Sequence, residues 1–220
     1  MKGSFNMRNL NVNNQKGRSM IEMLGVLAII GVLSVGGIAG YSKAMQKYRI
    51  NKTIEQITLI AGNVRTFFSN QQNYANLSGD AAMSIIKKAK LVPEEMWVMR
   101  ESARGIDKLN SAFDTQFYLL SVIKSGYKTF AVYLQVPEEA CIELATQDWN
   151  NINAAAVYIE GNPSEMFARG LTAVNGCSGS ASDNFVQGCA GGATVGLPIP
   201  IDKVTNPCSV SGQYFAIEFK

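Results

Sequence analysis

The chain contains no histidine among its 220 residues, and its charges are nearly balanced. The missing histidine excludes Ser-His-Asp and Cys-His relays, the zincin helix and every metal site that uses imidazole ligands. The net charge of +3 comes from the first 17 residues, which carry three basic side chains and no acid, so residues 18–220 sum to zero. A neutral body attracts phosphate poorly, and we therefore expect no nucleic-acid partner.

The sequence also has little that would serve catalysis. Its glycine runs are not followed by the Gly-Lys-Ser/Thr of a phosphate-binding loop. Two adjacent carboxylate pairs, Glu94-Glu95 and Glu138-Glu139, each follow a proline that marks a helix start. Acids in that position interact favourably with the helix dipole, which explains them better than acid–base chemistry does. We predict no catalytic residue, no cofactor and no enzymatic activity.

One long uncharged apolar run is present, from Met23 to Ser42. As a helix, its residues 23–41 would be about 28 Å long, which is close to the hydrocarbon thickness of a bilayer. No second run of this length occurs in the sequence, so we predict a single membrane span. The basic side chains of Lys2, Arg8 and Lys16 precede it and should keep the N-terminus in the cytoplasm.

A single carboxylate, Glu22, directly precedes the apolar run. A charge at this position is costly in lipid unless it is paired. One explanation is that Glu22 lies at the membrane interface, where an acid in the first turn of a helix interacts favourably with the helix dipole. The preceding residues suggest another, because Gly17 is followed by Arg18-Ser19-Met20-Ile21 and then by Glu22.

This order of glycine, glutamate and apolar run resembles the class III signal of type IV prepilins and pseudopilins. The resemblance implies that prepilin peptidase cuts between Gly17 and Arg18 on the cytoplasmic face of the membrane. It also implies N-methylation of Arg18 and places Glu22 fifth in the mature chain. The sequence departs from the family at Arg18, since the first mature residue there is usually apolar or aromatic.

The family's assembly role for the glutamate has a physical basis. After cleavage, the new amino group of Arg18 would lie one helical turn from Glu22. In a filament core that is poor in water, the carboxylate of one subunit can pair with the terminal ammonium of its neighbour, because an unpaired charge there is costly. Such a pair would fix the axial register, as a polar residue does in a coiled coil.

A conventional secretory signal peptide is the rival interpretation, and it would release an exported, disulfide-bonded binding domain. Small residues at Gly37 and Ala39 offer a cleavage site of the usual type. Against this hypothesis, Glu22 interrupts the start of the apolar region, the polar lead-in is long, and the apolar run exceeds most signal-peptide cores. We favour the prepilin interpretation.

The span should continue as one long helix. No proline occurs between Met20 and Gln71, and the apolar positions from Ile54 to Phe68 are spaced by 3, 4, 3 and 4 residues. We predict a helix of about 50 residues whose C-terminal half, about 45–70, is buried against a globular head. Within the span, Gly36 and Gly40 form a G-x-x-x-G pair that lets helices approach closely, although glycine is also simply common in membrane helices.

The remaining sequence indicates an α+β head, in which a long N-terminal helix packs on an antiparallel sheet with short helices and disulfides. We predict a leader over 1–17, a membrane and assembly half-helix over 18–44, and a head over 45–220. Residues 100–114 are polar, and residues 161–200 are rich in Gly, Ser and Asn and look like loops. The expected helices are 81–90 and about 137–149, with one more turn at 201–205, and the expected strands are 115–123, 129–136, 154–160 and 213–220.

All four cysteines, Cys141, Cys177, Cys189 and Cys208, follow the apolar run, in the compartment that we expect to be oxidising. An even number favours two disulfides, for which three connectivities are possible. A structural zinc site would need four thiolates, but the sequence has no C-x-x-C pair, so we predict no metal.

The head further resembles the type IVb subclass of pilins. In that subclass, a central strand pair precedes a V-P-x-x-x-C-x-x-L helix, here Val136 to Leu144, and a second cysteine comes shortly before the last strand. The resemblance implies a Cys141–Cys208 disulfide and leaves Cys177–Cys189 as the second. The resemblance does not extend to residues 161–200.

The sequence therefore predicts a structural subunit of a type IV, type IVb-like pilus. Before assembly it would lie in the bacterial inner membrane, and afterwards in an extracellular pilus or a periplasmic pseudopilus. Its expected partners are identical or related pilins, which form a helical filament, together with prepilin peptidase and the pilus assembly machinery. A minor pilin or a type II secretion pseudopilin is the alternative within the same architecture.

Overall fold

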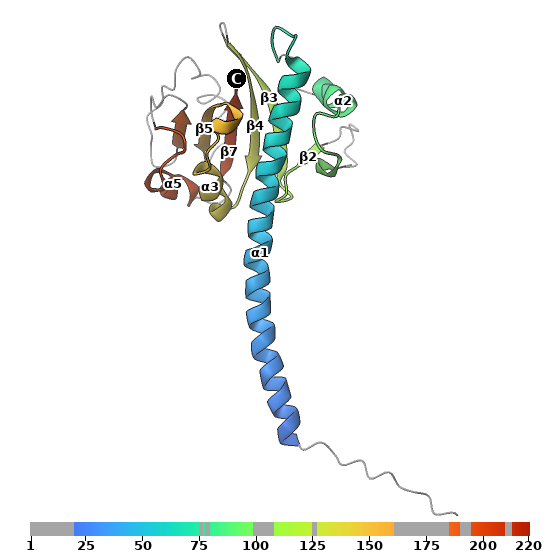
Figure 1. Ribbon diagram of the computed structural model, residues 1–220, viewed down its shortest axis with the longest axis vertical. Coiled ribbons are helices and arrows are strands. Elements are labelled where there is room, and N and C mark those ends of the chain that lie inside the picture. Colours follow the sequence, from blue (N-terminus) through green and yellow to red (C-terminus); the bar gives the residue numbers. More distant parts are fainter. Residues whose placement is uncertain are drawn as a thin grey trace, which may run out of the picture. The chain divides into compact units, whose positions relative to one another are not determined.

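The computed structural model describes residues 20–74, 77, 80–98, 108–124, 127–160, 185–189, 195–209 and 213–220 (Figure 1). The chain divides into two compact units, Met1–Ala44 and Met45–Lys220. The described part of the first unit, residues 20–44, is entirely helical. We call the second unit the head.

The prediction of one long helix is confirmed. Helix α1 runs from Met20 to Phe68, 49 residues without a proline. Within the head, one face of α1 is buried, at positions three or four residues apart as the sequence spacing indicated. The half-helix predicted to be buried, about 45–70, begins too early, because Tyr48 is 60% exposed and the buried face begins only at Ile50. The buried residues of α1 are Ile50, Thr53, Gln56, Ile57, Ile60, Ala61, Val64 and Phe68.

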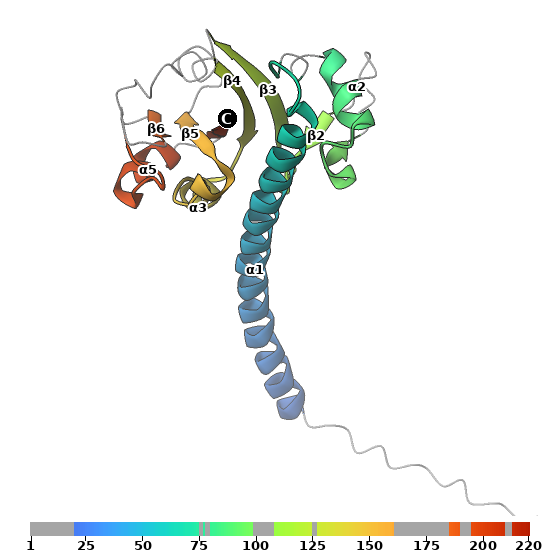
Figure 2. The same cartoon turned by 45° about the horizontal axis from the view of Figure 1, so that its top comes forward.

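Within the described residues, seven strands form a single antiparallel sheet in the order β1-β2-β3-β4-β7-β5-β6 (Figures 1 and 2). The central strands are β3 and β4, which form the predicted hairpin, and β7, which lies between β4 and β5. The last residues of the chain are therefore in the middle of the sheet rather than at its edge. The strands are β1 Trp97–Val98, β2 Lys108–Asn110, β3 Gln116–Lys124, β4 Tyr127–Gln135, β5 Ala154–Glu160, β6 Phe185–Cys189 and β7 Tyr214–Phe219.

The main core lies between one face of the sheet and the helices. Alternate residues of β4 and β7, such as Val132 and Ile217, point to this face and pair across the strands. Three short helices contribute apolar side chains to the same cluster. They are α2 (Asp80–Lys88), α3 (Glu138–Ala145) and α5 (Ile201–Cys208), and the described part of the head also contains 3₁₀ turns at Glu94–Met96 and Asn150–Ile152.

The opposite face of the sheet is also buried along its centre. Tyr133, Ala156, Tyr158 and Ala216 form a second, smaller cluster there, and each is at most 3% exposed. The central strands are thus buried on both faces, which explains their nearly continuous apolar and aromatic sequences.

Several predictions of element position made from the sequence were wrong. The helix expected to reach Trp149 ends at Ala145, since the indole Nε1–H of Trp149 donates to the Leu144 carbonyl at 2.7 Å and turns the chain back. The polar stretch 100–114 contains β2, and the loop-like stretch 161–200 contains β6. The single turn expected at 201–205 is the full helix α5.

Candidate functional site: an exposed apolar helix and a stapled head

The described residues of the first unit form an apolar helical surface. This segment of α1 is long and apolar enough to cross a membrane, judged by length and composition alone. Its large side chains are exposed along the whole segment, for example Val32 at 75% and Leu33 at 68%. Soluble proteins rarely expose so much contiguous apolar surface, so the segment is suited to lipid or to the same segment of other chains.

Glu22 lies in the first turn of α1 and is exposed. An acid there interacts favourably with the unpaired N–H groups of the helix start, and its carboxylate is accessible to a cation from another chain. Gly17 and Arg18, the residues of the expected cleavage and methylation sites, lie outside the described residues.

The two glycines of the G-x-x-x-G pair leave space on the helix surface. A Cβ atom added at Gly36 or Gly40 would meet no atom within 4 Å. The described part of the chain therefore does not itself require glycine at these positions. Close approach of another helix would be a reason for the small side chains.

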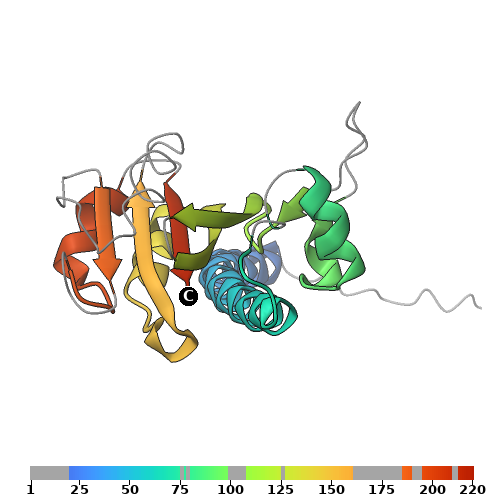
Figure 3. The same ribbon diagram turned by 90° about the horizontal axis from the view of Figure 1, so that it is seen from above.

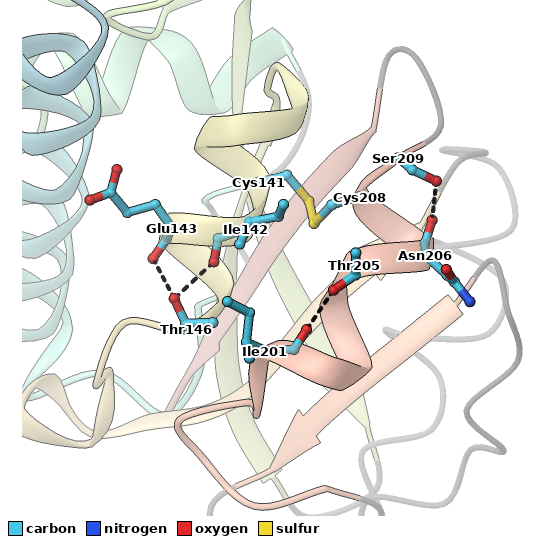
Figure 4. Close-up of a disulfide and its surroundings, with 9 residues drawn as sticks. All are labelled: Cys141, Ile142, Glu143, Thr146, Ile201, Thr205, Asn206, Cys208 and Ser209. Carbon is cyan, nitrogen blue, oxygen red and sulfur yellow. Dashed lines mark hydrogen bonds between the residues drawn. A yellow bond between two sulfur atoms is a disulfide. The ribbon is translucent and has the colours of Figure 1, made fainter. Parts of the chain in front are cut away.

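A disulfide joins Cys141 in α3 to Cys208 in α5 (Figure 4), which is the pairing that the type IVb resemblance implied. The Cα atoms are 5.6 Å apart, and both cysteines are fully buried. Because α3 follows β4 and α5 precedes β7, the bridge ties together the connections around the sheet centre. Cys189 is also disulfide-bonded, whereas Cys177 lies outside the described residues. Among the described residues there is no group of side chains that could hold a metal ion.

Ion pairs attach the head part of α1 to its surroundings. Lys47 contacts Glu143 of α3, and Lys52 Nζ lies 2.9 Å from Glu95 Oε1. The Gln56 amide also donates to Glu95, at 3.3 Å. The hydrogen bond from Lys52, with that from Gln56, holds the pKa of the Glu95 carboxyl below its usual value.

Arg65 is a structurally important residue that the sequence analysis missed. Its Nε donates to the Lys220 carbonyl at 2.8 Å, its Nη2 donates to the Asn153 carbonyl at 3.0 Å, and its guanidinium lies 5.4 Å from the ring centre of Phe219. Burial lowers the pKa of Arg65. Arg65 thereby fixes the end of β7 to α1. The sequence offered one indication of this role: Arg65 is a basic residue in the last turn of α1, next to the buried Val64.

A buried polar pair was also missed. The Tyr158 hydroxyl donates to Glu218 Oε2 at 2.8 Å, and both residues are fully buried on the second face of the sheet. Burial, together with the nearby carboxylate, raises the pKa of Tyr158. The pair joins β5 to β7.

Comparisons with known proteins agree with this architecture. The family model described as PilS N terminal matches residues 47–199. A crystal structure of a type IVb pilin from Salmonella typhi is similar to this chain with a TM-score of 0.53 and 13% sequence identity, over 77% of this chain and 99% of that one. No curated protein matches the sequence.

Proposed function

The chain belongs to the PilS N-terminal family and has the fold of a type IVb pilin, and on this premise we propose that it is a structural subunit of a type IVb-like pilus. In this proposal the subunit polymerises through the apolar half of α1. The family and the fold are structural rather than catalytic, so the activity of the chain is assembly.

The observation that carries the proposal is the combination of two parts in one chain. Residues 20–44 form an exposed, almost uncharged helix, and residues 45–220 form a head with a sheet and a disulfide. The family match spans residues 47–199 and therefore covers most of the head. The exposed helix supplies the apolar surface that a membrane-held precursor and a filament core both require.

Maturation in this proposal follows the prepilin route. The subunit is made with a leader, held in the inner membrane with its N-terminus in the cytoplasm, and cut between Gly17 and Arg18 by prepilin peptidase. The new terminus at Arg18 is N-methylated, and the assembly machinery then moves the subunit into the filament. The Gly17 position and the acid at Glu22 support this proposal.

Glu22 has a defined task in the assembled state. Its carboxylate lies in the first helical turn, where it can reach the terminal ammonium of a neighbouring subunit. In a core with little water this charge pair would favour one axial register over others, since every other register leaves two charges unpaired. Gly36 and Gly40 would allow the helices to pack closely around it.

N-terminal sequencing of the mature protein tests this proposal. We expect the mature chain to start at Arg18, and we expect Gly17→Asp to accumulate as full-length precursor in the membrane. Gly3→Asp, in the same leader but distant from the cut, is the matched control and should be processed normally. A mature start near Gly40 would identify an exported domain instead, and normal processing of Gly17→Asp would remove the prepilin interpretation.

The abundance of the chain in sheared surface filaments then separates the alternatives within the architecture. A major pilin forms most of the filament mass, whereas a minor pilin or a type II secretion pseudopilin contributes a small part or none.

A further inference from the structure

The disulfide between Cys141 and Cys208 joins cysteines that are not neighbours among the cysteines of the sequence. Cys177, which lies outside the described residues, and Cys189 come between them, and Cys189 is itself disulfide-bonded. An oxidant that joins cysteines in the order in which they enter the oxidising compartment would therefore form a different first bridge, from Cys141 to Cys177.

The topology of the sheet delays the native pairing until the end of the chain has arrived. Strand β7 lies between β4 and β5, and within the described sheet β5 pairs only with β7 and β6. In Figure 3, the red β7 separates the olive β4 from the orange β5. Before residues 214–219 are present, the β1–β4 part and the β5–β6 part of the sheet therefore have no strand pairing with each other.

Helix α3, which carries Cys141, gains its place in the fold only when these two parts are joined. It packs through Ala140 and Leu144 in the main core, to which β7 also contributes. The N–H of Val136, just before α3, donates to the carbonyl of Gln213, just before β7, at 3.0 Å. The thiol of Cys141 therefore stays accessible to oxidants while the two parts of the sheet are separate.

The order of entry and the lengths of the loops both favour the wrong partner. Chains emerge during synthesis at about 5–20 residues per second, so several seconds separate the entry of Cys141 from that of Cys208, which are 67 residues apart. Catalysed disulfide formation can occur on the same timescale. Cys177 is only about half as far from Cys141 as Cys208 is, and loop-closure entropy makes the shorter loop about two- to threefold easier to close.

A bridge from Cys141 to Cys189 is incompatible with the folded head. Cys141 and Cys208 belong to the main core, whereas Cys189 belongs to the second cluster, on the opposite face of the sheet. The two side chains are thus separated by the sheet itself. A chain with such a bridge cannot complete its core, and the error is corrected only when the bridge is broken again.

We propose that the head is a substrate of a disulfide isomerase, a thiol enzyme that breaks wrongly paired disulfides before β7 completes the sheet. The inference rests on the export of the head to an oxidising compartment, which is part of the proposed function, but it requires no filament. In the folded head, Cys141 and Cys208 are fully buried, so the enzyme acts on the chain before folding is complete.

The exchange reaction leaves the number of disulfides unchanged. A thiolate of the isomerase attacks Sγ of Cys141 in the wrong bridge, which forms a mixed disulfide and releases Cys177 as a thiolate. The thiolate of Cys208 then attacks the same sulfur, forms the native bridge and releases the thiolate of the enzyme. No electron is gained or lost, so further oxidation cannot replace this step.

Expression of the full-length chain in two bacterial hosts tests the proposal. Both hosts keep their periplasmic disulfide oxidase, and one of them lacks the disulfide isomerase. Peptide mapping of the membrane-held chain without reduction measures the fraction of Cys141 that is linked to Cys208. We expect nearly complete native linkage with the isomerase and a fraction about threefold lower or less without it, since the shorter loop then competes without correction.

Two variants with one cysteine pair each are the matched controls. Cys177→Ser with Cys189→Ser leaves only Cys141 and Cys208, and Cys141→Ser with Cys208→Ser leaves only the other two cysteines. Neither chain can form a wrong intramolecular bridge, so each should reach the same extent of pairing in both hosts. Because each variant lacks one bridge, the two together separate the order of pairing from a general loss of stability.

Equal native linkage of the wild-type chain in both hosts would overturn the proposal. A need for the isomerase in the variant that keeps only Cys141 and Cys208, as large as in wild type, would also overturn it, because the order of the cysteines would then not be the cause. Four reduced cysteines in both hosts would show that the head is not exported and would remove the proposed function as well. Isomerase-dependent native linkage in a chain that forms no filaments would support this inference and remove only the proposed function.

Discussion

At the scale of single residues, Gly188 in β6 shows how closely the head is packed. A Cβ atom at this position would lie 2.7 Å from Cδ1 of Ile199 and 2.8 Å from Cδ2 of Leu197. Both side chains belong to the segment that leads into α5 and pack against the main core. A dense interior cannot absorb an added methyl group without moving its neighbours.

We therefore expect Gly188→Ala to lower the free energy of unfolding by about 1–3 kcal/mol. Chemical unfolding of the full-length chain in detergent, followed by tryptophan fluorescence, measures this change. Gly196→Ala is the matched control and should have a small effect, because nothing lies within 4 Å of its added Cβ. A loss at Gly196 equal to that at Gly188 would contradict the steric explanation.

Glu95 gives a residue-scale prediction for pH. Its pKa is lowered in the folded chain by the hydrogen bonds from Lys52 and Gln56, so its interactions stabilise the fold above the unfolded pKa. This stabilisation is lost as the pH falls through the folded pKa. Since the side chain of Glu95 is half exposed, we expect its interactions to contribute at most about 0.5 kcal/mol to the free energy of unfolding.

The comparison is between Glu95→Gln and the neighbouring exposed Glu94→Gln. The first variant should be less stable than wild type at neutral pH and should lose this difference in acid, and the second should follow wild type throughout. Unfolding curves at several pH values give the result. An unchanged difference between Glu95→Gln and wild type across the acid range would show that the carboxylate charge is unimportant.

At the scale of elements, the disulfide between α3 and α5 restricts the conformations of a long connection. Cys141 and Cys208 are 67 residues apart, and the intervening chain includes β5 and β6 on one side of the sheet. Constraining so long a loop removes many conformations from the unfolded chain. The bridge also allows two helices of eight residues each to keep their places.

We expect Cys141→Ser to lower the free energy of unfolding by about 4 kcal/mol on the chain-entropy model. Cys141→Ser combined with Cys208→Ser should give a similar loss, which separates the missing bridge from the effect of a free thiol. Peptide mapping without reduction should find Cys141 linked to Cys208. Linkage of Cys141 to Cys177 or Cys189 instead would contradict the connectivity.

The elements that the sequence predicted well are those with a strong local pattern. Helix α1 has regular spacing and no proline, and the β3–β4 hairpin is rich in aromatic and β-branched residues. Strand β6 was missed because its pairing partner, β5, and not its own sequence, makes it a strand. The end of α3 was missed because it depends on the Trp149 indole.

Side-chain environments were harder to predict than elements. The last strand alternates in sequence, but its Glu218 is fully buried because Tyr158 supplies a hydrogen bond from β5. The aromatic side chains of Phe67 and Tyr118 are 43% and 36% exposed, although aromatic residues in a helix or strand are usually candidates for the core. The exposure of such side chains depends on which face of a helix or sheet is covered by distant parts of the chain. At the candidate assembly helix, the sequence indicated Glu22 and the two glycines of the G-x-x-x-G pair.

At the scale of the whole molecule, the chain combines two units with different solvent requirements. The head buries its apolar side chains and carries ion pairs on its surface. Residues 20–44 bury none of their large apolar side chains within the described chain. An apolar surface of this length is stable in lipid or against equivalent helices, and a filament subunit needs both environments in turn.

Glu22→Ala tests this account most directly, because it removes the one charge of the apolar helix that assembly would use. We expect cleavage, membrane insertion and the folded head to persist, since the variant removes a charge that is costly in lipid. Glu55→Ala, which removes an exposed carboxylate from the head part of the same helix, is the matched control and should assemble normally.

The measurement is the pilus mass sheared from cells, compared with the membrane-held mature subunit on an immunoblot. The account predicts that Glu22→Ala sharply lowers filament mass at a normal subunit level, because the incoming subunit loses its register contact and leaves a neighbour's terminal ammonium unpaired. Normal filament mass at a normal subunit level would contradict it and would make Glu22 an interfacial first-turn acid.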